Sequence, residues 1–518
     1  MKNFIKKSTI LMIGDIATKI ISVLYLIPLV RLNETIILLM TNLLVPFGTF
    51  IVLSTLGVNV ILTNELVKAK DDIAKRNVVL SIGILLSIIT AISIFIMYLI
   101  TPLVMRTIEG NPQYVEALVI GSRILIFGII LFSITSYLRS ILFAYGDYNI
   151  ISITYVSEQL IRVGLILVGV YYTIIKNKND VTVVIKVFVV AVLFSMLTTL
   201  FVFLYHFFKH NYYKLFFQGK YQFKLYKLKY FLGASLVLFI GGIYMSLFDL
   251  IDLLLLNKQM TIAGYSLQAI EQIKVEYFTM SLKIVMIPIL ISNSFINIMI
   301  KQIGEANKGK KEINNILFVV SLYSIFSFVG IMLLGQNVYQ LFYGEVGTKT
   351  IIFQSLIIPV YIIKNIIQGY IITNHGKAKS IFISTGVILS LKIILDILLF
   401  SLLGIYGYIL ATILSLISGL IVLVLMNKEL FYDFKNQVWQ NIKLFIKAIA
   451  LILVNVVIFL ALPNTINIFV LLILQSIIFV LSYALIYLID IKRLLHWNYF
   501  KNVKNVGLIN KYEDRIKV

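Results

Sequence analysis

The chain has 518 residues, of which 60% are hydrophobic and 13% are charged, and its 45 basic side chains exceed its 23 acidic ones by 22. Soluble domains average about 25% charged residues, so this composition excludes a soluble enzyme, and its hydrophobicity excludes a disordered chain. The absence of cysteine excludes disulfides, catalytic thiols and thiolate metal sites.

The amino end is basic and leads directly into a long apolar stretch. A cleaved signal peptide has a short apolar region followed by a small-residue cleavage site. This stretch is longer, lacks such a site, and contains Asp15 and Lys19. We therefore expect it to be retained as a first membrane-spanning helix.

Runs of about 20 mainly apolar residues, the length that crosses a bilayer, recur along the whole chain. There are about 14 of them, near 8–30, 35–60, 77–104, 117–142, 148–175, 181–208, 230–256, 276–300, 315–342, 350–373, 380–403, 405–427, 443–462 and 467–490. They predict an all-α polytopic membrane protein with about 14 transmembrane helices.

The most basic internal segment, 209–229, has six lysines and no acid, and it divides the chain. We expect an N-terminal six-helix lobe at 1–208, a C-terminal six-helix lobe at 230–427, two additional helices at 428–490, and a basic cytoplasmic tail at 491–518. The dividing segment alternates aromatic residues with lysine. It is either an amphipathic segment bound to anionic membrane lipids or an ordinary basic loop.

The distribution of basic residues predicts the orientation. With the amino terminus inside, the cytoplasmic segments hold about 28 Lys and Arg and the external segments about 7, as the positive-inside rule requires. Both termini are therefore expected on the cytoplasmic side of the membrane. This distribution explains the net charge without a nucleic-acid partner.

Ionisable residues at membrane depth are costly and usually face one another or an interior cavity. Three acid–base pairs have the i,i+4 spacing that places both members on one helix face: Asp15/Lys19, Glu158/Arg162 and Lys392/Asp396. For Glu158 and Arg162 we expect a structural ion pair. For the other two pairs, self-neutralisation and a functional role are both open.

Five basic residues in the spans have no acid on the same helical turn: Lys283, Lys364, Lys186, Arg123 and Arg139. Arg139 and Lys186 lie near helix ends, from which their side chains can reach the headgroups. Lys283 and Lys364 are better candidates for an anion-binding cavity.

Two further patterns concern cations. Asp249 and Asp252 share one face of the seventh span and would repel each other unless a cation or a basic residue lies between them. His206 and His210 have the spacing of a metal pair but no Glu or Cys nearby, so we expect no metal. With no nucleotide-binding loop and no Ser–His–Asp pattern, we also expect no cofactor and no catalytic residue.

Residues 136–167 resemble a signature of bacterial polysaccharide and peptidoglycan lipid flippases. The matching residues are Arg139, Ser157, Glu158, Gln159 and Arg162, while Ser140 and Ala144 replace the usual glycines. Residues 376–415 resemble a second signature, with its Gly-x-x-Lys loop, a helix containing Lys392, and a Gly404-x-x-Gly407 turn followed by Ala411 and Thr412. Residues 28–32 resemble the end of the family's first helix, with Asn33 in place of glycine, and the segment around Asp252 resembles the MurJ-type branch.

This resemblance is to the multidrug/oligosaccharidyl-lipid/polysaccharide exporter superfamily, in its stage V sporulation protein B and MurJ-type branch. It implies two six-helix lobes around a cavity that opens alternately to either side, plus two additional helices. It also implies a flippase that moves an undecaprenyl-diphosphate-linked saccharide from the inner to the outer leaflet. We expect substrate binding by Lys19, Arg31, Lys283 and Lys364.

The resemblance makes the helices of Asp249, Asp252, Asp396 and Thr412 neighbours, and their oxygens suit a small hard cation. The ammonium of Lys392 would occupy the same space as a tethered cation. We therefore expect weak or no sodium binding. Coupling would then come from protonation changes at Lys392 and Asp396 or from the membrane potential.

Two alternatives remain from the sequence. A multidrug or cation antiporter of the same superfamily would favour acids over bases in its cavity, whereas about ten bases and six acids lie in the spans. A polysaccharide polymerase or glycosyltransferase would need a large external loop or a catalytic acidic motif in a loop. The longest predicted external connection, 257–275, has Glu271 as its only acid. We expect a monomer that works beside the enzymes of cell-envelope synthesis.

Overall fold

The computed structural model describes residues 2–32, 34–175, 181–217, 225–292, 309–343, 349–373, 378–430, 434–463 and 466–495. Every regular element in these ranges is a helix. Fourteen helices in the described part of the chain are long and apolar enough to cross a membrane. The chain is a multi-pass membrane protein, and the predicted all-α fold is confirmed.

The first six spans are built from eight helices. They are α1 (Lys2–Leu24), α2 (Leu26–Leu32), α3 (Glu34–Thr55), α4 (Val58–Lys68), α5 (Asp72–Ile108), α6 (Pro112–Tyr145), α7 (Tyr148–Ile175) and α8 (Val181–Lys209). A short helix, α9 (Lys214–Phe217), follows. Helices suit the bilayer because hydrocarbon offers no partner for an unpaired backbone N–H or C=O.

The next six spans begin with α10 (Leu225–Ile262) and α11 (Leu267–Lys274), which a π-helix (Val275–Ser281) continues into the helical segment 282–292. They continue with α13 (Gly309–Tyr343), α14 (Thr350–Gln354), α15 (Ile357–Thr373), α16 (Ala378–Leu403) and α17 (Ile405–Met426). A 3₁₀ turn (Lys428–Leu430) precedes the last helices, which are α18 (Phe434–Leu460), α19 (Ile468–Ile486) and α20 (Leu488–Leu495).

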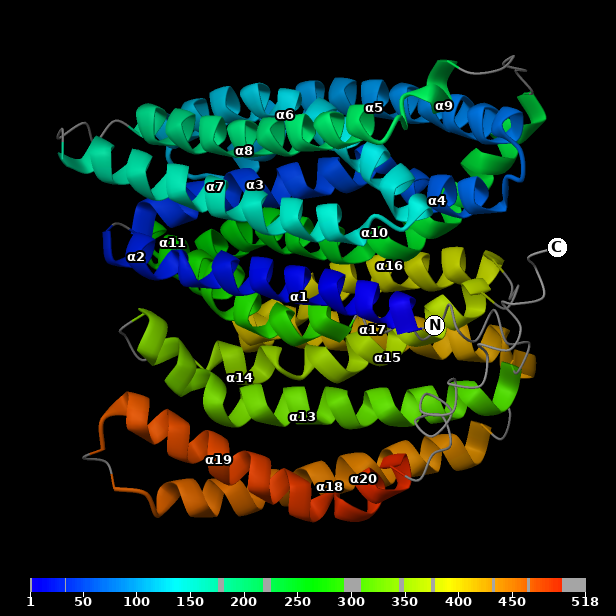
Figure 1. Cartoon of the computed structure of the whole chain (residues 1–518). Coiled ribbons are helices and arrows are strands. Elements are labelled where there is room, and N and C mark those ends of the chain that lie inside the picture. Colours follow the sequence, from blue (N-terminus) through cyan, green and yellow to red (C-terminus); the bar gives the residue numbers. More distant parts are fainter. Residues whose placement is uncertain are drawn as a thin grey trace.

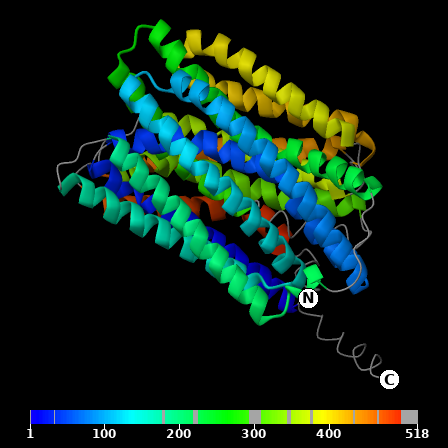
Figure 2. The same ribbon diagram turned by 90° about the horizontal axis from the view of Figure 1, so that it is seen from above.

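The helices run roughly side by side in layers (Figure 1). The helices α5, α6 and α8 lie on one side of the molecule and α13 and α15 lie toward the other, with α1, α10 and α16 between them in this view. The view from above shows the same common direction of the long helices (Figure 2). The additional helices α18 and α19 pack on the outer side of α13.

Prolines break two of the spans at positions that the sequence explains. A proline ring clashes with the carbonyl four residues earlier and donates no backbone hydrogen bond. Pro28 is four residues after Leu24, where α1 ends, and Pro359 is four residues after Ser355, which lies between α14 and α15. The first break places Tyr25 at a turn between α1 and α2.

The Gly404 turn brings α16 and α17 into close contact. Gly404 has a φ of 57°, in the left-handed region that glycine adopts readily. At Gly407 a Cβ atom would collide with the backbone carbonyl of Leu399. The two glycines therefore allow the start of α17 to pack directly against α16.

The predicted external connection at 257–275 is wrong. The helix α10 continues to Ile262, and α11 begins at Leu267, so only four residues lie between them. The polar residues that suggested a loop extend the helix instead, because their side chains find partners on other helices. Asn257 donates to the carbonyl of Thr107 at 3.4 Å, and Gln259 accepts a hydrogen bond from the hydroxyl of Tyr408.

The basic segment 209–229 is described only in part. Tyr212 donates to Asp147 at 2.7 Å, and the ring of Phe216 lies 6.3 Å from that of Tyr137, so this part folds back on α6. Residues 218–224 lie outside the described residues. The predicted tail at 491–518 begins within α20, and its residues from 496 onward lie outside the described part.

Candidate functional site

Three basic side chains from three helices gather between the two halves of the chain. Lys19 lies on α1, Arg162 on α7 and Lys283 on the segment 282–292, and Lys19 interacts electrostatically with the other two. All three side chains are partly buried. We call them the cationic centre. Like charges at membrane depth repel one another strongly, so an anion among them is favoured.

Acids offset only part of this positive charge. Asp15, one turn before Lys19, interacts with it electrostatically, and Glu158 pairs with Arg162. Lys283 forms no ion pair with any acid among the described residues. Within the described part of the chain, the centre therefore keeps one positive charge without a compensating carboxylate.

The position of Lys283 follows an irregular turn in its helix. The hydroxyl of Ser281 donates to the carbonyl of Glu276, five residues earlier, at 2.6 Å. This bond lies within the π-helix Val275–Ser281, and such i to i+5 backbone turns are frequent at functional sites. The turn ends two residues before Lys283, whose ammonium lies 5.7 Å from the centre of the Tyr25 ring.

Two tyrosines at the cationic centre were not predicted from the sequence. Tyr25 is buried and feels the charge of Arg162 as well as the contact with Lys283. Tyr343, on α13, interacts electrostatically with Tyr25, and its buried hydroxyl has no hydrogen-bond partner among the described residues. A phenol next to Tyr25 that has no hydrogen-bond partner among the described residues can donate to a bound oxygen anion. In the sequence, Pro28 was the feature that could have indicated a helix break at Tyr25.

Glu158 and Arg162 form an ion pair that other side chains support. Arg162 donates to Glu158 through Nη2 and to the hydroxyl of Ser195 through Nε at 3.2 Å. Thr199 donates to the second carboxylate oxygen of Glu158 at 3.0 Å. The pair thus joins α7 to α8, while its arginine also belongs to the cationic centre.

We expect Arg162→Gln and Glu158→Gln each to lower the amount of folded protein, because each leaves one uncompensated charge at membrane depth. Breaking a fully buried pair costs about 3–5 kcal/mol, and this pair is only partly buried, so its loss should cost less. Quantitative blotting of membranes measures the loss, and the exchange of the two residues should restore part of it. Normal abundance of both single variants would contradict a structural role for the pair and leave Arg162 to the cationic centre alone.

The other two predicted substrate residues are placed differently. Lys364 is fully buried between α15 and α10, where it donates to Gln368 at 2.5 Å and lies 3.6 Å from the centre of the Tyr244 ring. Both of these contacts of its ammonium therefore lie within the C-terminal half of the chain. Arg31 lies on α2, but its side chain is outside the described part of the structure.

A second charged cluster lies inside the C-terminal half. The ammonium of Lys392 donates to Asp252 on α10, to Asp396 on its own helix at 2.5 Å, and to the carbonyl of Tyr408 at 3.4 Å. Lys392 and Asp396 are 0% exposed, and Asp252 is 3% exposed. One buried ammonium thus holds oxygens from three helices.

The remaining predicted members lie around this ammonium. Asp249 interacts electrostatically with both Asp252 and Lys392, and Thr412 donates to the same Tyr408 carbonyl at 3.0 Å. Tyr277 donates to Asp252 at 3.1 Å. The sequence indicated that a cation or a basic residue should lie between the two aspartates of α10, but not which of the two, nor that a lysine 140 residues from Asp252 would bind it.

Hydrogen bonds join the two halves at the end where α5 finishes. Lys274, which is 1% exposed, donates to the carbonyl of Ile108 at 2.5 Å and interacts electrostatically with Glu109 and Glu271. Glu109 accepts a hydrogen bond from Asn42 at 2.8 Å. These contacts close this end of the interface between the halves, which the predicted orientation places outside the cell.

The histidine pair has an acid nearby after all. His206 lies 3.1 Å from Asp147, which the turn between α6 and α7 supplies, and its ring lies 4.2 Å from that of His210. The sequence did not indicate this partner, because Asp147 is distant from His206 along the chain. Among the described residues, no group of three or more His, Cys, Asp and Glu side chains is arranged to hold a metal ion.

Comparison with known proteins gives one sequence relative and several structural ones. No family model matches the chain. The lipid II flippase MurJ of Bacillus subtilis (strain 168) is 26% identical over 226 residues. This alignment covers 40% of the present chain and 41% of the relative, so it spans about two fifths of either protein.

The structural similarity covers nearly the whole chain. A lipid II flippase MurJ in an inward closed conformation matches with a TM-score of 0.60 and 17% identity, over 95% of this chain and 99% of the other. An inward-facing multidrug resistance MATE family transporter of the MOP superfamily matches with a TM-score of 0.59 and 16% identity, over 81% and 93%. The predicted resemblance and fold are confirmed.

Proposed function

We propose that the chain is a flippase that moves an undecaprenyl-diphosphate-linked saccharide from the inner to the outer leaflet of the bacterial plasma membrane by alternating access. The observation that carries this proposal is the cationic centre of Lys19, Arg162 and Lys283. Its members come from both halves of the chain, so a rearrangement of the halves would change the distances between them.

The chemistry of such a substrate suits the centre. A diphosphate and a sugar cannot cross hydrocarbon unaided, whereas a prenyl tail can stay in the lipid. Cationic side chains replace the hydration of the diphosphate through charge-assisted hydrogen bonds. Lysine binds phosphate as a point charge without fixed geometry, which favours release after transfer. The hydroxyl of Tyr343, which has no hydrogen-bond partner among the described residues, adds one donor.

The contacts between Lys274, Ile108 and Glu109 supply the outer barrier of the proposed cycle. In the conformation described here they close the end that we assign to the outside. Release into the outer leaflet would require Lys274 to leave the Ile108 carbonyl. A closure made of a hydrogen bond and charge attraction can open without unfolding any helix.

We also propose that Lys392 serves as a tethered cation, so that the protein binds sodium weakly or not at all. Its ammonium occupies the space among Asp252, Asp396 and the Tyr408 carbonyl. The cycle would then draw on the membrane potential or on protonation changes at Lys392 and Asp396. With no nucleotide-binding motif in the sequence, no nucleotide is required.

A multidrug or cation antiporter is the second candidate, and the likeness to MATE transporters together with Asp249, Asp252 and Asp396 favours it. Lys392 weighs against it, because its ammonium already neutralises part of that acidic cluster. A polymerase is less favoured, since the loop between α10 and α11 is only four residues long. We further propose that the protein is not an enzyme and that it works as a monomer beside the enzymes of envelope synthesis. Both of its termini would lie in the cytoplasm.

Transport of defined substrates by the purified protein tests this function. In liposomes, we expect the protein to move an undecaprenyl-diphosphate saccharide across the bilayer, detected by a membrane-impermeant enzyme that acts on the exposed sugar. Depletion of the protein in cells should make one lipid-linked precursor accumulate in the inner leaflet, and that precursor identifies the saccharide. Export of organic cations without any lipid-linked substrate transfer would favour the antiporter.

A further inference from the structure

A pocket of about 680 Å³ lies between the end of α5 and the start of α6, on helices that carry none of the cationic centre. Four charged residues line it: Arg106, Glu109, Glu116 and Arg123. Arg106, Glu116 and Arg123 are exposed on the surface of the molecule. The proposed transport function uses none of these three residues.

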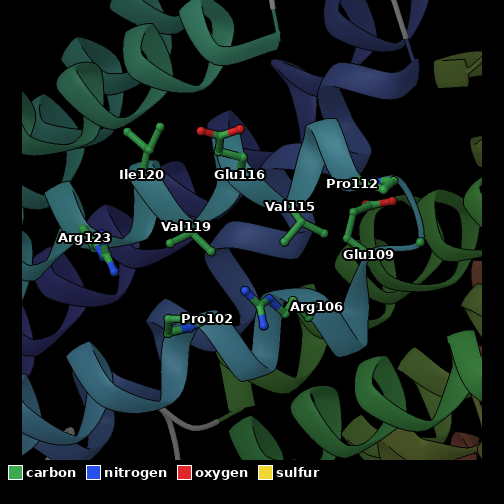
Figure 3. Close-up of a pocket in the computed structure, with 10 residues that line it drawn as sticks. Pro102, Arg106, Glu109, Pro112, Val115, Glu116, Val119, Ile120 and Arg123 are labelled. Atoms are coloured by element: carbon green, nitrogen blue, oxygen red, sulfur yellow. The ribbon is translucent and has the colours of Figure 1, made fainter.

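The two guanidinium groups share this pocket. Figure 3 shows the side chain of Arg123 on the side of α6 that faces α5, and that of Arg106 extending from α5 toward α6. The carboxylate of Glu116 points away from both arginines. Glu109 is engaged elsewhere, because it bonds to Asn42 and interacts with Lys274.

The charge of the pocket fits a single anion. Neither Arg106 nor Arg123 has an ion-pair partner among the described residues, and Arg123 lies 5.4 Å from the centre of the Tyr98 ring. Because Lys274 offsets the charge of Glu109, the charges that remain in the pocket are those of the two arginines and Glu116. Their sum is about one positive unit. That charge matches a phosphate diester better than a diphosphate.

The depth of the arginines fits a lipid headgroup. Arg123 lies six residues beyond 117, where the apolar stretch of α6 begins, which is about 9 Å along the helix. Arginine side chains at this depth extend toward the headgroup level, where a phosphate can compensate their charge. Exposed apolar side chains of α5 continue into the membrane from Arg106: Leu103, Leu99 and Phe95. They cover about 12 Å, most of one leaflet.

We propose that this pocket is a binding site for an anionic phospholipid, whose phosphate lies between Arg106 and Arg123 and whose acyl chains lie along Leu103, Leu99 and Phe95. The predicted orientation assigns this lipid to the outer leaflet. The last turn of α5 carries Arg106 and also Ile108, to which Lys274 bonds. The lipid therefore contacts the same turn that closes the outer end.

Native mass spectrometry of the full-length protein, titrated with phosphatidylglycerol or phosphatidylcholine, tests the site. We expect the wild type to retain phosphatidylglycerol preferentially, and Arg106→Gln/Arg123→Gln to weaken its binding about 10-fold or more. Arg106→Lys/Arg123→Lys keeps the charge and should retain part of the preference. Lys186→Gln is the matched control, because Lys186 is an exposed cation in another lipid-facing pocket, between α7 and α8.

Three results would overturn the site: equal binding of the two lipids, unchanged phosphatidylglycerol binding by the double glutamine variant, or an equal loss in Lys186→Gln. Displacement of the lipid by millimolar glycerol phosphate would overturn the lipid as occupant, because the acyl chains would then contribute nothing. Melting temperatures in phosphatidylcholine show whether the double glutamine variant is folded. If the double variant is unfolded, binding of phosphatidylglycerol and phosphatidylcholine is measured in the single variants Arg106→Gln and Arg123→Gln instead. A preference for phosphatidylglycerol that persists in both single variants would overturn the site.

Discussion

Transfer of a lipid-linked saccharide should fall about 10- to 100-fold when Lys283 is replaced by alanine, because one charge-assisted contact with a phosphate contributes about 1.5–3 kcal/mol. Lys283 is the member of the cationic centre without an acidic partner among the described residues. Lys19→Ala should behave similarly, as should Arg31→Ala if its side chain reaches the same substrate. Transfer in liposomes and complementation of a depleted strain measure the effect.

Membrane insertion should stay intact in Lys283→Ala, since removing a cation that has no acidic partner among the described residues lowers the cost of placing the helix in hydrocarbon. Lys283→Arg keeps the charge and should retain much of the transfer rate. Lys186→Ala is the matched control, because Lys186 is a lipid-facing lysine outside the centre. Normal complementation by Lys19→Ala, Arg31→Ala and Lys283→Ala alike would refute a cationic binding site at these positions.

The spans could be predicted from the sequence because their formation is decided locally. A run of about 20 apolar residues must satisfy its own backbone in hydrocarbon, whatever its neighbours are. The chain accordingly has spans at the expected places, including the broken ones that end at Leu24 and Gln354 before prolines. The helix α10 extended beyond prediction because Asn257 and Gln259 find partners on other helices, which no local pattern encodes.

The site depended on contacts between distant parts of the chain. Charge at membrane depth pointed correctly to residues of interest, but not to which of them would meet. Lys364 and Lys283 looked equivalent in the sequence, yet one is enclosed by Gln368 and Tyr244 and the other lies beside Tyr25 and Lys19. Tyr343 carried no signal at all, because a tyrosine in an apolar helix is usually a packing residue.

The cluster around Lys392 leads to the second large expected effect. Lys392 is the hydrogen-bond donor that holds Asp252, Asp396 and the Tyr408 carbonyl together. Removing a partner from a buried ion pair costs about 3–5 kcal/mol. In a sodium-free buffer with choline as cation, Lys392→Asn should therefore melt well below the wild type or fail to accumulate.

Sodium should leave the wild type unchanged but stabilise the Lys392→Asn variant. In the wild type the ammonium fills the space among the oxygens, so replacing choline with sodium should change neither the melting temperature nor the transport rate. In Lys392→Asn the vacated space is lined by carboxylate and carbonyl oxygens, the ligands that a small hard cation prefers. A cation that binds only the folded state stabilises it, so sodium should raise the melting temperature of this variant.

Lys447→Asn, which breaks a partly exposed ion pair with Asp490 between α18 and α20, controls for the loss of a lysine and should show no such dependence. A strong sodium dependence of wild-type transport that disappears in Asp396→Asn would show that the sodium ion, and not Lys392, is the cation on which the cycle depends.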